Sequence, residues 1–152
     1  MVLSTHALKP GHRADVRACA RQDVFRLPAM GASVADARAR IRARLSEWGA
    51  DAELRDDAGL VVTELFTNAV RHTDSKHIMC ALRDIGPYVR LEVTDQGCAD
   101  ASPVPCTATD DEEGGRGLLL VSALAAAWGS DPAADGAGRV VWAELAVHHA
   151  PR

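Results

Sequence analysis

The segment that most constrains the predicted fold and function of this chain is Glu64-Leu-Phe-Thr-Asn68-Ala-Val-Arg-His72. It closes a predicted helix over residues 52–72, in which apolar side chains recur at helical spacing. The apolar stripe consists of Ala58, Val61, Val62, Leu65 and Ala69. Glu64, Asn68 and His72 recur every fourth residue and therefore share a second face of this helix. Asn is a poor residue for a helix interior because its side chain competes for backbone hydrogen bonds, so this face indicates a polar site.

The chemistry of this polar face suits a hydrated magnesium ion. Mg²⁺ takes oxygen ligands and keeps several waters, so the amide oxygen of Asn68 together with phosphate oxygens would be sufficient. Glu64, one turn earlier, offers a carboxylate that could orient a nucleophile. The alternative is an ordinary hydrated helix face, and the stripe alone leaves both readings open.

Asp95-Gln96-Gly97 is the second feature, and it directly follows a strongly alternating strand over residues 89–93. An acid at the end of a strand can accept a hydrogen bond from an exocyclic amine such as that of adenine. A glycine two residues later lets the backbone approach a flat ring closely. The alternative is a plain turn that ends the strand, where Asp and Gly are both common.

Gly114-Gly115-Arg116-Gly117, the third feature, runs directly into Leu118. A glycine-rich turn that opens a helix exposes free N–H groups and a partial positive charge, which together favour an anion. The segment is not a P-loop, because the pattern GxxxxGK[ST] is absent. It is not a dinucleotide fingerprint either, because no strand immediately precedes it. The expected helix runs from Leu118 to Trp128 and ends at Gly129.

The remaining periodicities complete a prediction of fold class. A short first strand over residues 24–27 precedes a helix that is capped by Ser33 and ended by Gly49. Strands are expected over 78–82, 89–93 and 140–147, with a lid or loop over 96–115 and a turn over 130–138. This order predicts an α+β, two-layer sandwich: a mostly antiparallel sheet with helices on one face and a flexible lid.

Composition limits the class of protein. With 152 residues, 47% of them apolar and 4% aromatic, the chain suits one domain with an aliphatic core. A net charge of −4 argues against direct binding of nucleic acid through a basic surface. No apolar run reaches the roughly 18 residues of a membrane helix, and no signal peptide is recognisable. The four cysteines form no CxxC pair, which favours a reduced, cytoplasmic setting.

Arginine occupies positions 38, 40, 42 and 44, within the first predicted helix. The simplest expectation is a hydrated surface, and the alternatives are an acidic protein partner or a nucleotide phosphate. Residues 1–22 show no clear period and are predicted to form a loose extension.

The three motifs, in this order, resemble the GHKL ATP-binding fold, also called the Bergerat fold. Within it the chain is similar to the small stand-alone anti-sigma factor and serine-protein kinases of partner-switching systems. The resemblance covers about residues 24–147: residues 64–72 match the N box, 95–97 the first G box and 115–118 the second. Trp128-Gly129 and residues 140–145 match the closing segment. One departure is Ala99, where many relatives carry a further glycine.

The resemblance implies a GHKL domain over residues 23–149 that binds ATP and Mg²⁺. Asn68 would coordinate the metal, Arg71 and His72 would lie near the phosphates, and Glu64 would be the general base. Asp95 would bind the adenine amine, with Gly97 beneath the ring. The segment that would cradle the phosphates consists of Gly115, Arg116, Gly117 and Leu118.

The activity implied by the resemblance is that of a protein-serine/threonine kinase. It would phosphorylate an anti-anti-sigma partner of the STAS type, sequester a sigma factor and form a homodimer, without contacting nucleic acid or membrane. The alternative is a catalytically silent module that binds a nucleotide and docks a partner. A weaker alternative, a redox protein, rests only on Cys98 and Cys106.

Overall fold

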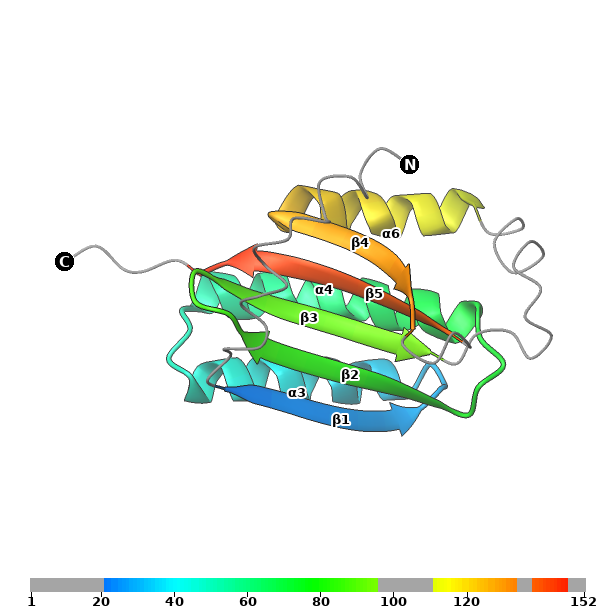
Figure 1. Cartoon of the computed structure of the whole chain (residues 1–152), viewed down its shortest axis with the longest axis horizontal. Helices are drawn as coiled ribbons and strands as arrows, with labels where there is room; N and C mark the ends of the chain where they lie inside the picture. The colour runs from blue at the N-terminus through cyan, green and yellow to red at the C-terminus, as the bar shows by residue number, and fades with distance from the viewer. Residues whose placement is uncertain (1–20, 96–110, 134–137, 148–152) are drawn as a thin grey trace.

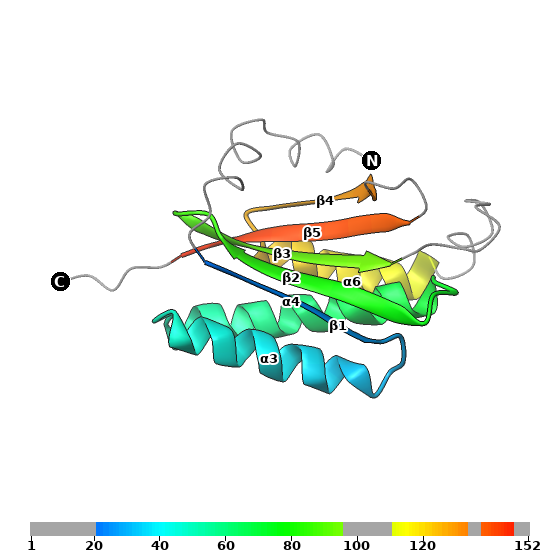
Figure 2. The same cartoon turned by 60° about the horizontal axis from the view of Figure 1, so that its bottom comes forward.

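The computed structural model describes residues 21–95, 111–133 and 138–147. Over residues 111–117 it describes the course of the backbone and not the side chains. The elements, in chain order, are β1 (Gln22–Pro28), α3 (Ser33–Glu47), α4 (Ala52–Arg71), β2 (His77–Asp84), β3 (Tyr88–Asp95), α6 (Asp111–Leu124), β4 (Ala127–Pro132) and β5 (Arg139–Ala146). The strands form one sheet in the order β1-β2-β3-β5-β4, and every neighbouring pair is antiparallel. Figures 1 and 2 show α3, α4 and α6 on one face of this sheet. The predicted α+β sandwich is therefore confirmed. The predicted lid lies largely outside the described residues.

The core lies between the sheet and the helices. In β3 the buried residues Val89, Leu91 and Val93 alternate with half-buried polar ones, as the period of two requires. They pack in the same cluster as the apolar stripe of α4. Helix α4 contacts α3 on one side and α6 on the other, and it also packs against β3 and β5. This central helix, which carries the polar stripe, is thus held on three sides.

The two long helices begin and end for local reasons. Asp51 caps α4, because its side chain accepts a hydrogen bond from the N–H of Leu54 at 2.9 Å. Ser33 does not cap α3 as predicted: Ala32 holds the N-cap position, and Ser33 is the first, buried residue of the helix. The backbone already turns before this point, since the N–H of Ser33 donates to the carbonyl of Met30 at 3.0 Å. Gly49, at φ 86°, follows α3 as expected.

The C-terminal part of the sheet corrects a second prediction. Helix α6 ends at Leu124, and Trp128 and Gly129 belong to strand β4 instead of closing a helix. Trp128 lies opposite Ala143 of β5 and packs against the main core. The alanine-rich segment fits helical spacing equally well, and glycine is rare inside strands. Pairing with β5 overrides both local preferences.

The arginines of α3 are not simply hydrated. Arg40 and Arg44 both contact the carboxylate of Asp23 on β1, at 3.0 and 3.3 Å. Arg38 donates to the hydroxyl of Thr63 on α4 at 2.9 Å. Arg42 forms an ion pair with Asp56, which also lies on α4. These side chains connect α3 to the elements beside it. Arg40 and Arg44 are therefore both paired with Asp23.

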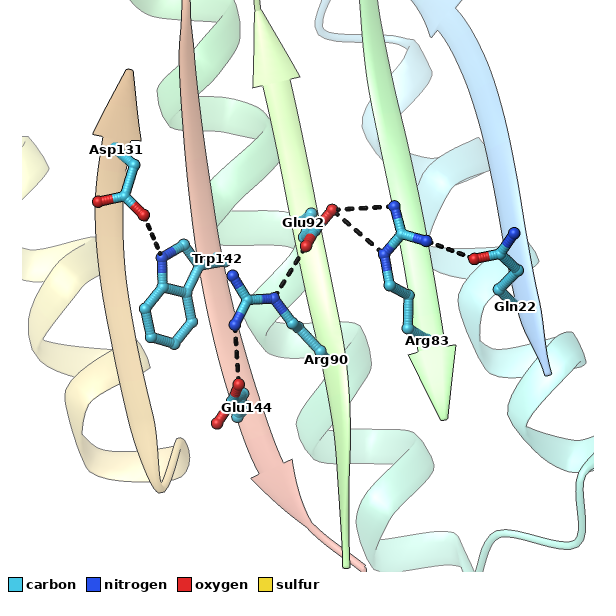
Figure 3. A network of polar contacts seen from close by, with 7 residues as sticks. All are labelled: Gln22, Arg83, Arg90, Glu92, Asp131, Trp142 and Glu144. Atoms are coloured by element: carbon cyan, nitrogen blue, oxygen red, sulfur yellow. Dashed lines mark hydrogen bonds and ion pairs between the residues drawn. The ribbon is translucent and has the colours of Figure 1, made fainter. Parts of the chain in front are cut away.

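The face of the sheet away from the helices carries a polar network (Figure 3). Arg90 of β3 donates to Glu92 and to Glu144 of β5, each at 2.8 Å. Its guanidinium also lies 4.1 Å from the ring centre of Trp142. Arg83 of β2 extends the chain of contacts by pairing with Glu92 at 3.3 Å. Arg83 also donates to Gln22 of β1, and the indole N–H of Trp142 donates to Asp131 of β4 at 3.2 Å. The network thus crosses all five strands.

Within the described part of the chain, no helix combines the length and apolar character that crossing a membrane requires.

Candidate functional site

The residues singled out from the sequence gather at one end of the molecule. The C-terminal end of α4, the C-terminal end of β3 and the N-terminal end of α6 lie together there, as both views show (Figures 1 and 2). The pairing of Met79 with Thr94 brings the start of β2, which follows α4, beside the end of β3. The fold therefore brings together the polar stripe of α4 and the end of β3, and it places the start of α6, which contains the glycine-rich motif, beside them.

Glu64 and Asn68 lie one turn apart on α4, and both side chains are half-buried. No hydrogen bond or ion pair engages either side chain among the residues that the structure describes. His72 is the C-cap of the helix, with its N–H donating to the carbonyl of Ala69 at 3.2 Å, and Arg71 is exposed beside it. A carboxylate and an amide at the boundary between core and solvent are thus available to a ligand.

The rotation of α4 about its axis is fixed by the residues around this stripe. Thr63, the neighbour of Glu64, accepts from Arg38 of α3 and donates to the carbonyl of Gly59 at 2.7 Å. Gly59 itself makes room for α3, because a Cβ there would lie 3.3 Å from carbons of the Arg38 and Arg42 side chains. These contacts and the buried apolar stripe leave Glu64 and Asn68 on the side of α4 away from α3.

Asp95 is the last residue of β3 and is only 9% exposed. It continues the alternation of Val89, Leu91 and Val93, so it faces the helices. Its neighbour across the sheet is Arg139, the first residue of β5. An almost buried carboxylate at the end of a strand is the geometry expected of a hydrogen-bond acceptor for a ligand amine. Sequence reasoning missed Arg139, because only the register of β3 with β5 brings it beside Asp95.

The glycine-rich motif is placed differently from its prediction. Gly97 lies outside the described residues, and the backbone of Gly115, Arg116 and Gly117 lies inside α6 instead of in a turn before it. Leu118, the last residue of the motif, is half-buried in the same helix. The N–H groups left free at a helix N-terminus are those of its first residues, which here begin at Asp111. The acidic run over 111–113 favours this earlier start, because carboxylates stabilise the first turn of a helix.

The donor set of the site fits magnesium held partly by a ligand. No group of three or more His, Cys, Asp or Glu side chains among the described residues could hold a metal by itself. The amide oxygen of Asn68 is a hard oxygen donor, and Mg²⁺ is usually bound through one or two protein oxygens together with phosphates and water. Cys80 is not a competing reactive group, because burial raises the pKa of its thiol to about 12.

Comparisons with known proteins agree with this geometry. A family model described as the histidine kinase-like ATPase domain matches residues 27–145. Among solved structures, the RsbU and RsbW domains of Rv1364c from Mycobacterium tuberculosis are similar, with a TM-score of 0.63 and 22% identity. The match covers 87% of this chain and 34% of that one, and at this identity it shows the fold alone. No curated protein matches the chain.

Proposed function

Because this chain belongs to the histidine kinase-like ATPase domain family, we propose that it is an ATP-dependent protein-serine/threonine kinase of the partner-switching type. The domain would span residues 23–149 and act in the cytoplasm. The observation that carries the proposal is the joint placement of Glu64, Asn68 and Asp95 at one end of the fold. A module that only bound a nucleotide would need Asp95 and Asn68, but it would have no use for the carboxylate of Glu64.

Each of these residues has a distinct role in the proposal. Asp95, almost buried, would accept a hydrogen bond from the amine of adenine. Gly97 is assigned to the face of the ring from its place in the sequence. Asn68, one turn beyond Glu64, contributes its amide oxygen to Mg²⁺, which neutralises charge on the phosphates when bound. Arg71 and His72, at the end of α4, lie on the phosphate side. We also assign Gly115, Arg116, Gly117 and Leu118 to the phosphate side, which they would border from within α6 and not as a turn before it.

The transfer step that we propose uses Glu64 as a general base. Its carboxylate takes the proton of a Ser or Thr hydroxyl on the partner, and the hydroxyl oxygen bonds to the γ-phosphorus of ATP. The bond between the γ-phosphorus and the β–γ bridging oxygen breaks, and ADP leaves. A positioned base of this kind contributes a factor of roughly 10²–10⁴ in rate, and the rest is positioning and charge neutralisation.

The proposed protein partners are an anti-anti-sigma protein of the STAS type, as phosphate acceptor, and a sigma factor, with the kinase as a homodimer. Two observations support this choice. The first is the similarity in fold to a structure that contains an RsbW domain. The second is the net charge of −4, which does not suit direct contact with nucleic acid.

Calorimetric titration with ATP and ADP, with and without Mg²⁺, tests the nucleotide site. The native chain is expected to bind ATP at micromolar concentration in a magnesium-dependent way, and Asn68→Ala is expected to lose that dependence. Ser46→Ala, an exposed position on α3, is the matched control and should behave like the native chain. Absence of binding by the folded native chain would overturn the proposal.

Transfer of labelled γ-phosphate to a STAS-type acceptor tests the kinase activity. We expect Glu64→Gln to bind ATP normally and to lose transfer by roughly 10²–10⁴-fold. Glu53→Gln is the control, because Glu53 is an exposed carboxylate in the first turn of the same helix. Equal transfer by native chain and Glu64→Gln would contradict the role of Glu64. Binding with no transfer by the native chain to any such acceptor would favour the catalytically silent module.

A further inference from the structure

From the burial of side chains on the face of the sheet away from the helices, we propose that residues 1–20 of the same chain pack across that face, over β3, β5 and β4. We call this face, which carries the polar network of Figure 3, the outer face. The proposal assigns an interaction surface and its occupant, and it does not depend on ATP binding or on phosphate transfer. Residues 1–20 lie outside the described part of the chain, so the support comes from the residues that they would cover.

Strand register arranges the outer face in rows that run across the sheet, with one residue from each strand in sheet order. The first row consists of Gln22, Arg83, Arg90, Glu144 and Ala127. The second row consists of Val24, Ala81, Glu92, Trp142 and Gly129. Both rows lie at the end of the sheet where β1 begins. The helices of the described chain all lie on the other face, as Figure 2 shows, so none of them covers these rows.

Exposure falls along both rows with distance from β1. In the first row Gln22 is exposed, the side chain of Arg90 is 11% exposed, and Glu144 is fully buried. In the second row Val24 is 45% exposed, whereas Trp142 is buried. An open sheet face would leave an arginine and a tryptophan much more accessible than this. The burial pattern therefore indicates a cover over β3, β5 and β4 that leaves β1 open.

The side chains of the network do not provide this cover by themselves. The guanidinium of Arg90 lies over the ring of Trp142, but Arg90 is itself nearly buried and needs atoms above it. Ala127 is also buried, although β4 is an edge strand. Together with Trp142 it forms a hydrophobic cluster separate from the main core, and small clusters of this kind usually lie under a long chain segment. These exposures belong to a single chain, so the burial requires no second copy.

Length and position favour residues 1–20 over the other segments outside the described residues. Residues 96–110 and 134–137 begin after Asp95 and Ala133, at the end of the sheet away from the two rows. Residues 148–152 follow Val147, which packs against the main core, and they are too few to cover two rows of three strands. Residues 1–20 lead into Gln22 in the first row. At about 3.3 Å per residue they could reach roughly 66 Å, whereas five strands at about 4.8 Å spacing are only roughly 19 Å across.

Charge favours the same segment. Residues 1–20 contain three basic side chains and one acidic side chain, those of Lys9, Arg13, Arg17 and Asp15. Their net charge of +2 leaves −6 for the rest of the chain, whose total is −4. The network itself combines two guanidinium groups with three carboxylates, since Asp131 joins it through Trp142. A basic segment is therefore attracted to the outer face.

Paramagnetic broadening in the full chain tests this proposal. A nitroxide is attached at Ala14→Cys after replacement of the other reactive cysteines by serine, and Cys80 is kept because its thiol is buried. Residue 14 is far enough from Gln22 along the chain to reach β5, which lies about 14 Å from β1. The indole N–H signal of Trp142 is expected to lose most of its intensity, relative to the same sample with the nitroxide reduced.

Trp48 is the internal control for a segment that does not pack. The guanidinium of Arg21, where residues 1–20 join the described chain, lies 5.1 Å from the ring centre of Trp48. A loose extension would move around Arg21 and broaden the signal of Trp48 at least as strongly as that of Trp142, and this result would overturn the proposal. A second nitroxide position, His12→Cys, shows whether the label itself disturbs the packing. The proposal fails if neither position broadens Trp142 more than Trp48.

A mixed sample separates the chain's own segment from that of a second copy. Chain labelled with ¹⁵N and lacking the nitroxide is mixed with an equal amount of unlabelled chain that carries it. We expect the Trp142 signal to keep its full intensity in this mixture, because the contact forms within one chain. Broadening in the mixture as strong as in the singly prepared sample would assign the outer face to a second copy and overturn the proposal.

Discussion

The two faces of the sheet bury side chains by different physics, and β3 displays both. Leu91 points toward the helices and is 1% exposed, whereas its neighbours Arg90 and Glu92 lie on the other face within the polar network. Glu144, across from Arg90 on β5, is as deeply buried as Leu91. Burial alone therefore does not separate the faces. What separates them is whether a side chain needs a particular partner.

A buried leucine is stabilised by leaving water, and many different neighbours satisfy it. A buried carboxylate is tolerated only through its partner, because desolvation costs several kcal/mol per ion. Arg90 provides this partner to Glu144 while also contacting Glu92 and the ring of Trp142. The helix-covered face should thus respond to lost volume, and the network face should respond to lost pairing.

The largest expected effect is that of removing one member of the buried ion pair. Glu144→Ala leaves the guanidinium of Arg90 without its partner on β5, and we expect the free energy of unfolding to fall by about 3–5 kcal/mol. Urea denaturation followed by circular dichroism measures it. Glu53→Ala, an exposed carboxylate on α4, should change the free energy by less than about 0.5 kcal/mol. A loss below about 1 kcal/mol for Glu144→Ala would mean that water reaches the pair.

On the helix-covered face, Leu91→Ala should cost about 2–5 kcal/mol, because it removes buried methyl groups and leaves a cavity. The same denaturation experiment applies. Leu91→Met keeps most of the volume and should cost less than about 1.5 kcal/mol. If both variants lost equal stability, the packing of the core would not depend on volume at this position, and the contrast between the faces would fail.

The face that each β3 residue occupies could be predicted from the sequence, because strict alternation over Tyr88–Asp95 requires it. The partners could not. Glu144 and Arg90 are far apart in the chain, and only the register of β3 with β5 makes them neighbours. The strand β4 was missed for the same reason, since its pairing with β5 is a tertiary interaction that its alanines and glycine do not indicate.

The candidate site shows the same division. The shared face of Glu64 and Asn68 follows from helical period alone, and the structure places both on α4 as predicted. The start of α6 could not be placed, because glycines at 114, 115 and 117 suggest a turn whereas the acidic residues before them favour a first helical turn. Arg139 depends on register alone, as Glu144 does.

An ion pair between the sheet and a helix provides an intermediate case. Asp23 of β1 is nearly buried, and the hydrogen bond from Arg40, aided by Arg44, lowers the pKa of its carboxyl group. A carboxyl whose folded pKa lies below its unfolded value of about 3.9 stabilises the fold above that pH, and the gain is lost as the pH falls through the folded pKa. Arg40 is half-exposed, so we expect Asp23→Asn to cost only about 1 kcal/mol at pH 7.

The pH dependence of this variant separates charge from shape. Native chain and Asp23→Asn should differ in free energy of unfolding at pH 7 and should converge as the pH is lowered toward 2. Denaturation at pH 7, 4 and 2.5 measures the difference. A difference that stayed constant across this range would assign the loss to the altered side-chain geometry and not to the ionised carboxylate.

The smallest expected effect comes from removing the whole buried pair. In Arg90→Met with Glu144→Leu, neither charge is left alone, and apolar side chains of similar size fill the space beside Trp142. Such exchanges are often neutral or stabilising, so we expect the free energy of unfolding to stay within about 1 kcal/mol of the native value. Glu92 keeps its contact with Arg83 at 3.3 Å. Because each single variant keeps one charge of the Arg90–Glu144 pair and the double variant keeps neither, the two losses should be strongly non-additive in a double-mutant cycle. A loss of about 3 kcal/mol or more in the double variant would show that the pair itself stabilises the fold. Both faces of the sheet would then make a net favourable contribution to the free energy of unfolding.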